Sequence, residues 1–101
     1  MYTNKTANLK MQKPLVKTLE LDRSIYQCEV LDYDEKSERI LLRLKGSNIQ
    51  KLALNTTYEC QILLGDKNVL CTGIIQERYV DERGCILNLR IESGFYEINI
   101  K

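Results

Sequence analysis

Residues 56–78 constrain the fold more than any other stretch of this chain. From Tyr58 to Leu64 every second residue is apolar, and this period of two is typical of a β-strand with one buried face. Gly65-Asp66-Lys67-Asn68 follows, and these residue types accept the backbone conformations of a tight turn. A second apolar run occupies residues 69–75. The stretch therefore predicts a β-hairpin, to which the rest of the chain adds further strands.

The same alternation recurs on both sides of this hairpin. Charged or glycine-containing segments between the periodic stretches predict turns at residues 32–37, 46–48, 79–84 and 92–94. Pro14 is the only proline, so no later stretch carries the residue that most strongly opposes a strand. Short sequential strands favour an antiparallel arrangement. We therefore expect an all-β fold, a small six-stranded antiparallel barrel with a partly ordered N-terminal segment and with strands at residues 25–31, 39–45, 58–64, 69–75, 85–91 and 96–100.

The apolar parity of each strand predicts which side chains fill the barrel. The expected interior consists of Tyr26, Cys28, Val30, Ile40, Leu42, Leu44, Tyr58, Cys60, Ile62, Leu64, Val69, Cys71, Ile75, Cys85, Leu87, Leu89, Ile91, Tyr96, Ile98 and Ile100. All four cysteines share this parity, and a buried free thiol behaves as a small apolar group, so we expect them to be reduced and buried. Gly73, inside a strand, predicts a bulge or bend that helps the sheet to close.

The segments outside the predicted strands differ in composition. Residues 1–24 carry a net charge of +3 and are polar at their start, which is typical of a loosely attached terminus. The apolar run at residues 15–21 predicts that part of this segment packs on the body. We therefore divide the chain into a basic N-terminal tail at 1–24, partly packed on the barrel, and a β-barrel domain at 25–101. Ile49, Leu52 and Leu54 predict that their connection lies across one end of the barrel.

Charge and hydropathy exclude several classes of protein. The 15 basic and 14 acidic side chains nearly cancel, so no overall field attracts nucleic acid or an anionic membrane. No apolar run approaches the roughly 20 residues that span a bilayer, and residues 1–6 lack the apolar core of a signal peptide. We expect a cytoplasmic protein that does not associate with membranes.

The sequence lacks the usual components of a catalytic or metal site. It contains no histidine, and Cys28, Cys60, Cys71 and Cys85 show no Cys-x-x-Cys spacing, so neither a zinc site nor a cysteine nucleophile with an imidazole base is expected. The acidic residues at 32–35 begin like a calcium loop but do not continue its pattern. Glycine-rich phosphate motifs are absent. We therefore expect a protein that is not an enzyme and has no cofactor.

The outward parity provides the candidates for a binding surface. It places Leu41, Leu63, Leu70, Ile74, Ile86 and Phe95 on the outside of the barrel, and apolar residues on adjoining strands would form a patch that needs a cover. Either residues 15–21 or a second copy of the chain could cover this patch. The partner-binding candidates are Leu41, Leu63, Ile74, Ile86, Phe95, Arg39 and Arg43, which favour a protein partner or self-association. The alternative is a small nucleic-acid-binding barrel that uses Arg39, Arg43, Lys45 and the basic tail.

The order of elements resembles the PilZ family, and most closely the PilZ-like N-terminal barrel of flagellar-brake proteins. The resembling residues are Tyr26-Gln27-Cys28-Glu29-Val30, the turn and strand at residues 54–62, and Cys71-Thr72-Gly73-Ile74-Ile75. The resemblance implies a barrel in bacterial signalling or motility that acts through protein contacts. Family members that bind cyclic di-GMP use an Arg-x-x-x-Arg loop, where this chain has Lys13-Pro14-Leu15-Val16-Lys17, and an Asp/Asn-x-Ser-x-x-Gly motif, where it has Asp22-Arg23-Ser24-Ile25-Tyr26-Gln27. Lysine lacks the bidentate fork of arginine, so we expect no cyclic di-GMP binding.

Overall fold

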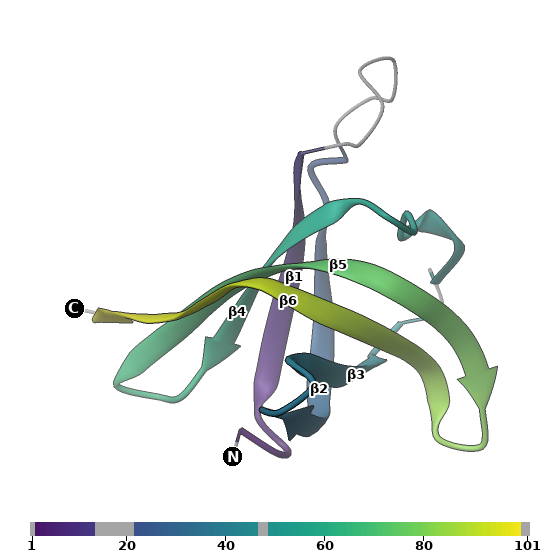
Figure 1. Cartoon of the computed structure of the whole chain (residues 1–101). Coiled ribbons are helices and arrows are strands. Elements are labelled where there is room, and N and C mark those ends of the chain that lie inside the picture. Colours follow the sequence, from purple (N-terminus) through teal and green to yellow (C-terminus); the bar gives the residue numbers. More distant parts are fainter. Residues whose placement is uncertain (1, 14–21, 47–48, 100–101) are drawn as a thin grey trace.

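The structure, a computed structural model, describes residues 2–13, 22–46 and 49–99. Its elements are β1 (Thr6–Lys13), β2 (Ile25–Asp34), β3 (Arg39–Leu44), the 3-10 turn η1 (Ile49–Lys51), β4 (Thr57–Leu63), β5 (Lys67–Asp81) and β6 (Gly84–Asn99). The strands form a closed barrel in the order β1-β2-β3-β6-β5-β4, and every pair is antiparallel (Figure 1). The expected all-β, six-stranded antiparallel barrel is thus confirmed.

The first strand of the barrel lies where the sequence predicted a tail. β1 pairs with β2 on one side and with β4 on the other, and in this way it closes the barrel. Ala7, Leu9 and Met11 are buried in the core, while the residues between them face outward. The division at residue 24 is therefore wrong, because the barrel begins at Thr6. The apolar run predicted to cover the sheet, at 15–21, lies outside the described residues.

The last strand is longer than predicted. β6 continues through residues 92–94, where the sequence predicted a turn. Its register with β5 shifts twice between Ile91 and Tyr96, so the extra residues form bulges and the strand does not reverse. The inward parity of Leu89 and Ile91 therefore continues to Phe95, and Tyr96 and Ile98 face outward. The prediction that Tyr96 and Ile98 lie inside is wrong, and Ile100 lies outside the described residues.

Two other predicted turns are shorter in the structure. β2 continues to Asp34 after a register shift between Val30 and Asp32, so its hairpin with β3 turns at residues 35–38. β5 continues to Asp81, and only Glu82 and Arg83 separate it from β6. Together β5 and β6 form a long curved ribbon that crosses the other strands (Figure 1). Six strands were predicted and six are present, but only because β1 was missed and β6 was counted as two.

The core follows the predicted parity over most of the chain. The buried core residues are Ala7, Leu9, Met11, Tyr26, Cys28, Val30, Ile40, Leu42, Leu44, Leu52, Tyr58, Cys60, Ile62, Cys71, Ile75, Leu87, Leu89 and Ile91. Burial of a large apolar side chain contributes about 1.5–3 kcal/mol, so these residues hold the barrel together. Val69 is also buried, whereas Leu64 and Cys85 are half-buried against the core. The prediction of full burial is therefore wrong for Cys85.

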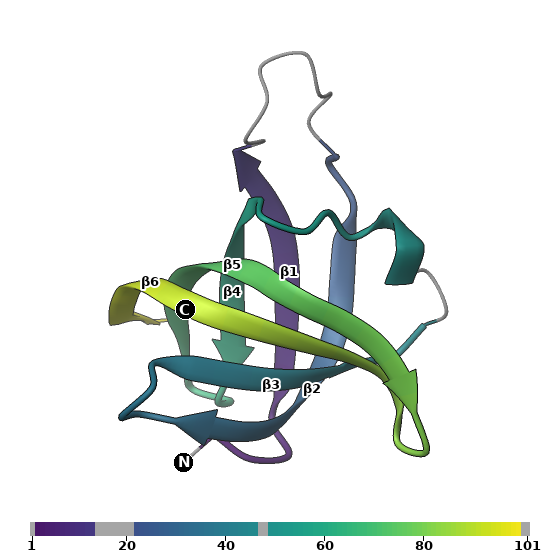
Figure 2. The same ribbon diagram turned by 45° about the vertical axis from the view of Figure 1, so that its right-hand side comes forward.

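One end of the barrel is closed by the connection between β3 and β4. Leu52 is completely buried, and Ile49 packs against the core, as the apolar content of this connection predicted. The guanidinium of Arg78 donates hydrogen bonds to the carbonyls of Leu52 and Gln50 and so fixes η1. Figure 2 shows this short helical turn in the connection from β3 to β4. Leu54 differs from the prediction because its side chain is exposed.

Candidate functional site

Five of the seven predicted partner-binding residues lie on one outer surface, formed by β3, β6 and β5. Arg39, Leu41 and Arg43 alternate with the buried residues of β3 and therefore face outward. Ile86 of β6 lies opposite Arg43. Ile74 of β5 lies on the same outer face of the sheet. We call Arg39, Leu41, Arg43, Ile74 and Ile86 the β3–β6 surface. Leu63 and Phe95 lie elsewhere, so the structure does not unite the predicted set.

The apolar members of the β3–β6 surface are largely covered. Ile86 is completely buried although it lies outside the core cluster, between Arg43 on one side and Tyr79 on the other. Leu41 and Ile74 are half-buried. The expected exposed patch is therefore wrong at this surface, because neighbouring long side chains on adjoining strands cover the apolar ones.

Two of the basic residues on and beside this surface, Arg43 and Arg90, have acidic partners. Arg43 forms an ion pair with Glu29 of the adjacent strand. Arg39 lies between Asp34 of β2 and Arg90 of β6. Hydrogen bonds from Ser37, then one from Lys36, and last the charge of Arg39 hold the pKa of Asp34 below its usual value. The guanidinium of Arg90 lies 3.6 Å from a carboxylate oxygen of Glu92. Lys45 is exposed and donates to Thr6. Because two of these cations are already paired, the surface offers fewer free charges to a phosphate backbone.

Phe95 was predicted to face outward, but it packs against the core. Its ring centroid lies 5.3 Å from that of Tyr2 and 5.1 Å from that of Tyr33. These separations are favourable for aromatic contacts, which add about 0.5–1.5 kcal/mol to area burial. The three rings are partly buried and pack against the hydrophobic core, so Phe95 has a structural role.

The exposed apolar residues that the sequence did not predict lie on the last part of β6. We call residues 93–99 the β6 arm. Tyr96 is 52% exposed and Ile98 is 41% exposed on its outer face. On the same face Leu63 of β4 lies opposite Asn68 of β5, which in turn lies opposite Ile98. If the inward and outward alternation of β6 is continued from Leu87 without a break, it places Tyr96 and Ile98 on the outside, so the sequence could have identified both exposed residues.

A buried polar atom lies beneath this face. Asn68 is only 7% exposed, and its Oδ1 atom has no hydrogen-bond partner among the described atoms. A buried acceptor that makes no hydrogen bond costs about 1–3 kcal/mol. Leu70, also predicted to be exposed, is buried in the next row, opposite Tyr96. The outer face of β4, β5 and the β6 arm therefore combines apolar side chains with one unused acceptor.

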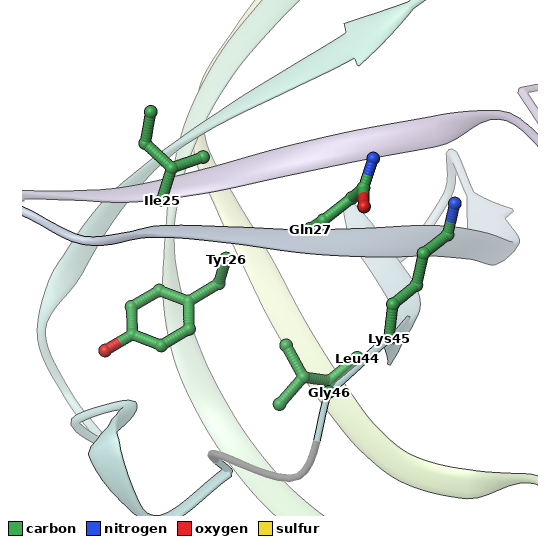
Figure 3. Close-up of a pocket in the computed structure, with 6 residues that line it drawn as sticks. All are labelled: Ile25, Tyr26, Gln27, Leu44, Lys45 and Gly46. Atoms are coloured by element: carbon green, nitrogen blue, oxygen red, sulfur yellow. The ribbon is translucent and has the colours of Figure 1, made fainter.

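The depressions of the barrel surface are shallow and open to solvent. One, with a volume of about 350 Å³, is lined by Asp32, Asp34, Ser37, Arg39, Leu41 and Asn88. Another, with a volume of about 220 Å³, is lined by Ile25, Tyr26, Gln27, Leu44, Lys45 and Gly46 (Figure 3). Typical small-molecule sites occupy roughly 300–1,000 Å³ and bury most of their ligand. The Tyr26 hydroxyl donates to the Asp22 carboxylate, and burial, followed by this hydrogen bond, raises the pKa of Tyr26 to about 12. The phenol remains protonated at neutral pH and is engaged in structure rather than in proton transfer.

The cysteines are all free thiols. Cys60 and Cys71 lie directly opposite each other on β4 and β5, and both are buried, as is Cys28. The hydrogen bond with Cys71 and burial raise the pKa of Cys60 well above its usual value, and burial raises the pKa of Cys28 to about 12. Only Cys85 is partly exposed.

These environments predict unequal thiol reactivity. In native protein treated with a maleimide, Cys85 should react first and the other three thiols only slowly, because a buried thiol is inaccessible to the reagent. Mass spectrometry over time should show one rapid modification, which disappears in Cys85→Ser. Rapid modification of two or more thiols would contradict the burial described above.

Within residues 2–13, 22–46 and 49–99, no three Cys, Asp or Glu side chains lie close enough to hold a metal ion together. No helix in that part of the chain is long and apolar enough to cross a membrane.

Comparison with known proteins gives no relative: no family model, no curated protein and no solved structure matches this chain. Of the features that the PilZ resemblance implied, the structure shows the small six-stranded antiparallel barrel. The features that bear on function are therefore those of the barrel surface.

Proposed function

We propose that this chain is a non-catalytic β-barrel module that acts through protein contacts, with the β6 arm as its docking surface. The observation that carries the proposal is the exposure of Tyr96 and Ile98 on a strand whose other edge is unpaired within the described residues. Exposed apolar side chains beside a free strand edge suit the addition of a further β-strand. A cytoplasmic role in bacterial signalling or motility, which the PilZ-like pattern implies, is part of the same proposal.

The alternative of nucleic-acid binding has less support. Single-strand binders combine a basic groove with exposed aromatic rings on one sheet face. Here Arg43 and Arg90 have acidic partners, and Tyr96 lies on a different part of the barrel from the β3–β6 surface. Cyclic di-GMP is not part of the proposal, because the arginine pair and the glycine of its binding motifs are missing.

The test is a selection of random displayed peptides on the purified chain at nanomolar concentration. We expect the wild type to enrich peptides with alternating apolar residues, because an added strand places every second side chain beside Tyr96 and Ile98. Ile98→Lys should weaken the selected peptides at least about tenfold, or ~1.4 kcal/mol. Val80→Lys is the matched control, because Val80 is exposed on β5, away from the β6 arm.

Two results would contradict the proposal. One is the absence of any enriched peptide. The other is equal binding by the Ile98→Lys and Val80→Lys variants, which would show that the β6 arm does not form the docking surface.

A further inference from the structure

The β6 arm has a free edge. The pairing of β3 with β6 ends where Arg39 lies opposite Arg90, and one further hydrogen bond joins Ile91 N to Glu38 O. Beyond it, β5 is the only described strand that pairs with the arm. The arm extends away from the body of the barrel (Figure 1). Along such an edge half of the backbone N–H and C=O groups point outward and are available to another strand.

Beyond the bulges, which end at Tyr96, the edge of the β6 arm carries few of the devices that normally prevent pairing. Proteins protect free edges with charged side chains, proline, β-bulges or short strands. The opposite corner of the barrel has such protection, since β5 beyond Ile75 carries Glu77, Arg78 and Asp81. The β6 arm contains no proline, and its one charged residue is Glu97. That carboxylate is neutralised by Lys67 at 2.9 Å.

We propose that two copies of the chain associate through antiparallel pairing of their β6 arms, centred on Glu97. This inference rests on the proposed function and names its partner, a second copy. With Glu97 at the centre, Tyr96 of each copy lies opposite Ile98 of the other, on the outer face of a continuous sheet.

The side chains of the arm are complementary to themselves in this register. Tyr96 and Ile98 flank Glu97 symmetrically and both face outward, so a two-fold axis through Glu97 creates two identical aromatic–aliphatic pairs. Aromatic and β-branched residues are favourable cross-strand neighbours. A register centred on Tyr96 would instead place the charged Glu97 beside Phe95, which packs in the aromatic cluster. The centre at Glu97 is therefore preferred.

The charges of the arm keep this association weak. In the preferred register the two Glu97 side chains lie directly opposite each other, and like charges in that position oppose pairing. Lys67 beside each carboxylate reduces the repulsion without removing it. An interface of one strand from each copy is also small, which is typical of transient contacts. We therefore expect a dimer that forms reversibly with concentration.

Sedimentation velocity over a concentration series tests the association. The wild type should shift from the 11.8 kDa monomer toward twice that mass as concentration rises toward about 1 mM. Ile98→Lys should stay monomeric at all concentrations, and Val80→Lys should behave as the wild type. Glu97→Gln should strengthen association by about two- to fivefold, because it removes the like-charge pair.

Cross-linking tests the register. Directly opposed residues in an antiparallel pair have Cα atoms about 4.5–5.5 Å apart, within disulfide range. In a Cys85→Ser background, Glu97→Cys should therefore give a covalent dimer on mild oxidation, whereas Ser93→Cys should not.

A wild type that remains monomeric throughout the concentration series overturns the inference. So does efficient cross-linking of Ser93→Cys with none of Glu97→Cys. If the wild type is monomeric and still selects peptides that Ile98→Lys fails to bind, the second copy is excluded while the proposed docking function stands. If it is monomeric and selects no peptide, both fail.

Discussion

Removal of residues 1–13 is expected to abolish cooperative unfolding. The deletion takes away β1, which supplies Ala7, Leu9 and Met11 to the core and pairs with both β2 and β4. Burial of the two larger side chains alone contributes about 1.5–3 kcal/mol each. The loss of two strand pairings and the opening of the core come in addition, against a total stability of about 5–15 kcal/mol for a domain of ordinary size. The truncated chain should therefore not keep a stable monomeric fold.

Chemical denaturation followed by circular dichroism measures this effect. The full chain should show one sigmoidal transition, whereas the truncated chain should show none, or should aggregate through the exposed edges of β2 and β4. A synthetic peptide of residues 1–13, added in excess, should restore the transition. Retention of the full transition by the truncated chain would show that β1 is not part of the barrel.

Point variants separate the role of β1 from effects of truncation. Leu9→Ala should lower the free energy of unfolding by about 2–5 kcal/mol, because it leaves a cavity in a closed core. Lys10→Thr, at the next residue and exposed, should change it by less than about 0.5 kcal/mol. Equal effects of the two variants would contradict the alternation described for β1.

The alternation that identifies β1 is present in the sequence. Ala7, Leu9 and Met11 occupy every second position, but they stand among Asn, Thr and Lys and beside the chain terminus. Composition then favours a solvated tail, and the contribution of so small a side chain as Ala7 is easily missed. The closure of the barrel makes this segment a strand, because β1 lies between two strands that would otherwise have open edges.

The central strands were predictable because their period of two is uninterrupted. Tyr26 and Cys28 of β2, like Leu42 of β3, face inward as the alternation indicated. The β6 arm was not predictable in the same way, because Glu92-Ser93-Gly94 has the composition of a turn and forms bulges within a continuous strand. After a turn, a new strand could place either set of alternate residues inside the barrel. The two bulges together add two residues, so the residues that follow them keep the inward and outward alternation of the strand before. The assignment of Phe95, Tyr96 and Ile98 was therefore reversed.

The candidate site was only partly predictable for a related reason. Outward parity identified Leu41 and Ile86 correctly as residues outside the core cluster, but parity does not reveal how far neighbours cover them. Ile86 lies between two long side chains, Arg43 of β3 and Tyr79 of β5, and it is buried although it was predicted to be exposed. The free edge of β6 arises because β6 continues past Arg90, the partner of the first residue of β3, and no local pattern indicates that continuation.

Replacement of Gly73 by alanine is expected to destabilise the barrel more than any other single methyl addition at its glycines. A Cβ atom at Gly73 would lie 2.5 Å from the carbonyl oxygen of Arg90 and 2.9 Å from Cγ of Leu89. The first of these is backbone of the neighbouring strand and cannot move aside without disturbing the β5–β6 pairing. The close approach arises at a bulge, because the register of β5 with β6 shifts between Thr72 and Gly73.

The size of the effect follows from the crowding of the site. Overpacking of a filled core costs about 1–3 kcal/mol, and a contact with backbone places Gly73→Ala at about 2–3 kcal/mol. For a domain of this length the melting temperature should then fall by about 10–20 °C. Thermal denaturation measured by circular dichroism at one protein concentration provides the value.

Gly94→Ala is the matched control, since Gly94 lies in β6, has no heavy atom within 4 Å of the added Cβ and does not adopt a positive φ. Alanine at this position restricts the unfolded chain and causes no clash in the folded one. The free energy of unfolding of Gly94→Ala should therefore be equal to that of the wild type or higher by up to about 1 kcal/mol. The two substitutions add the same methyl group to neighbouring strands, and the structure predicts opposite signs. Equal melting temperatures would show that β5 and β6 do not approach each other closely at Gly73, and the bulged closure of the barrel would then be wrong.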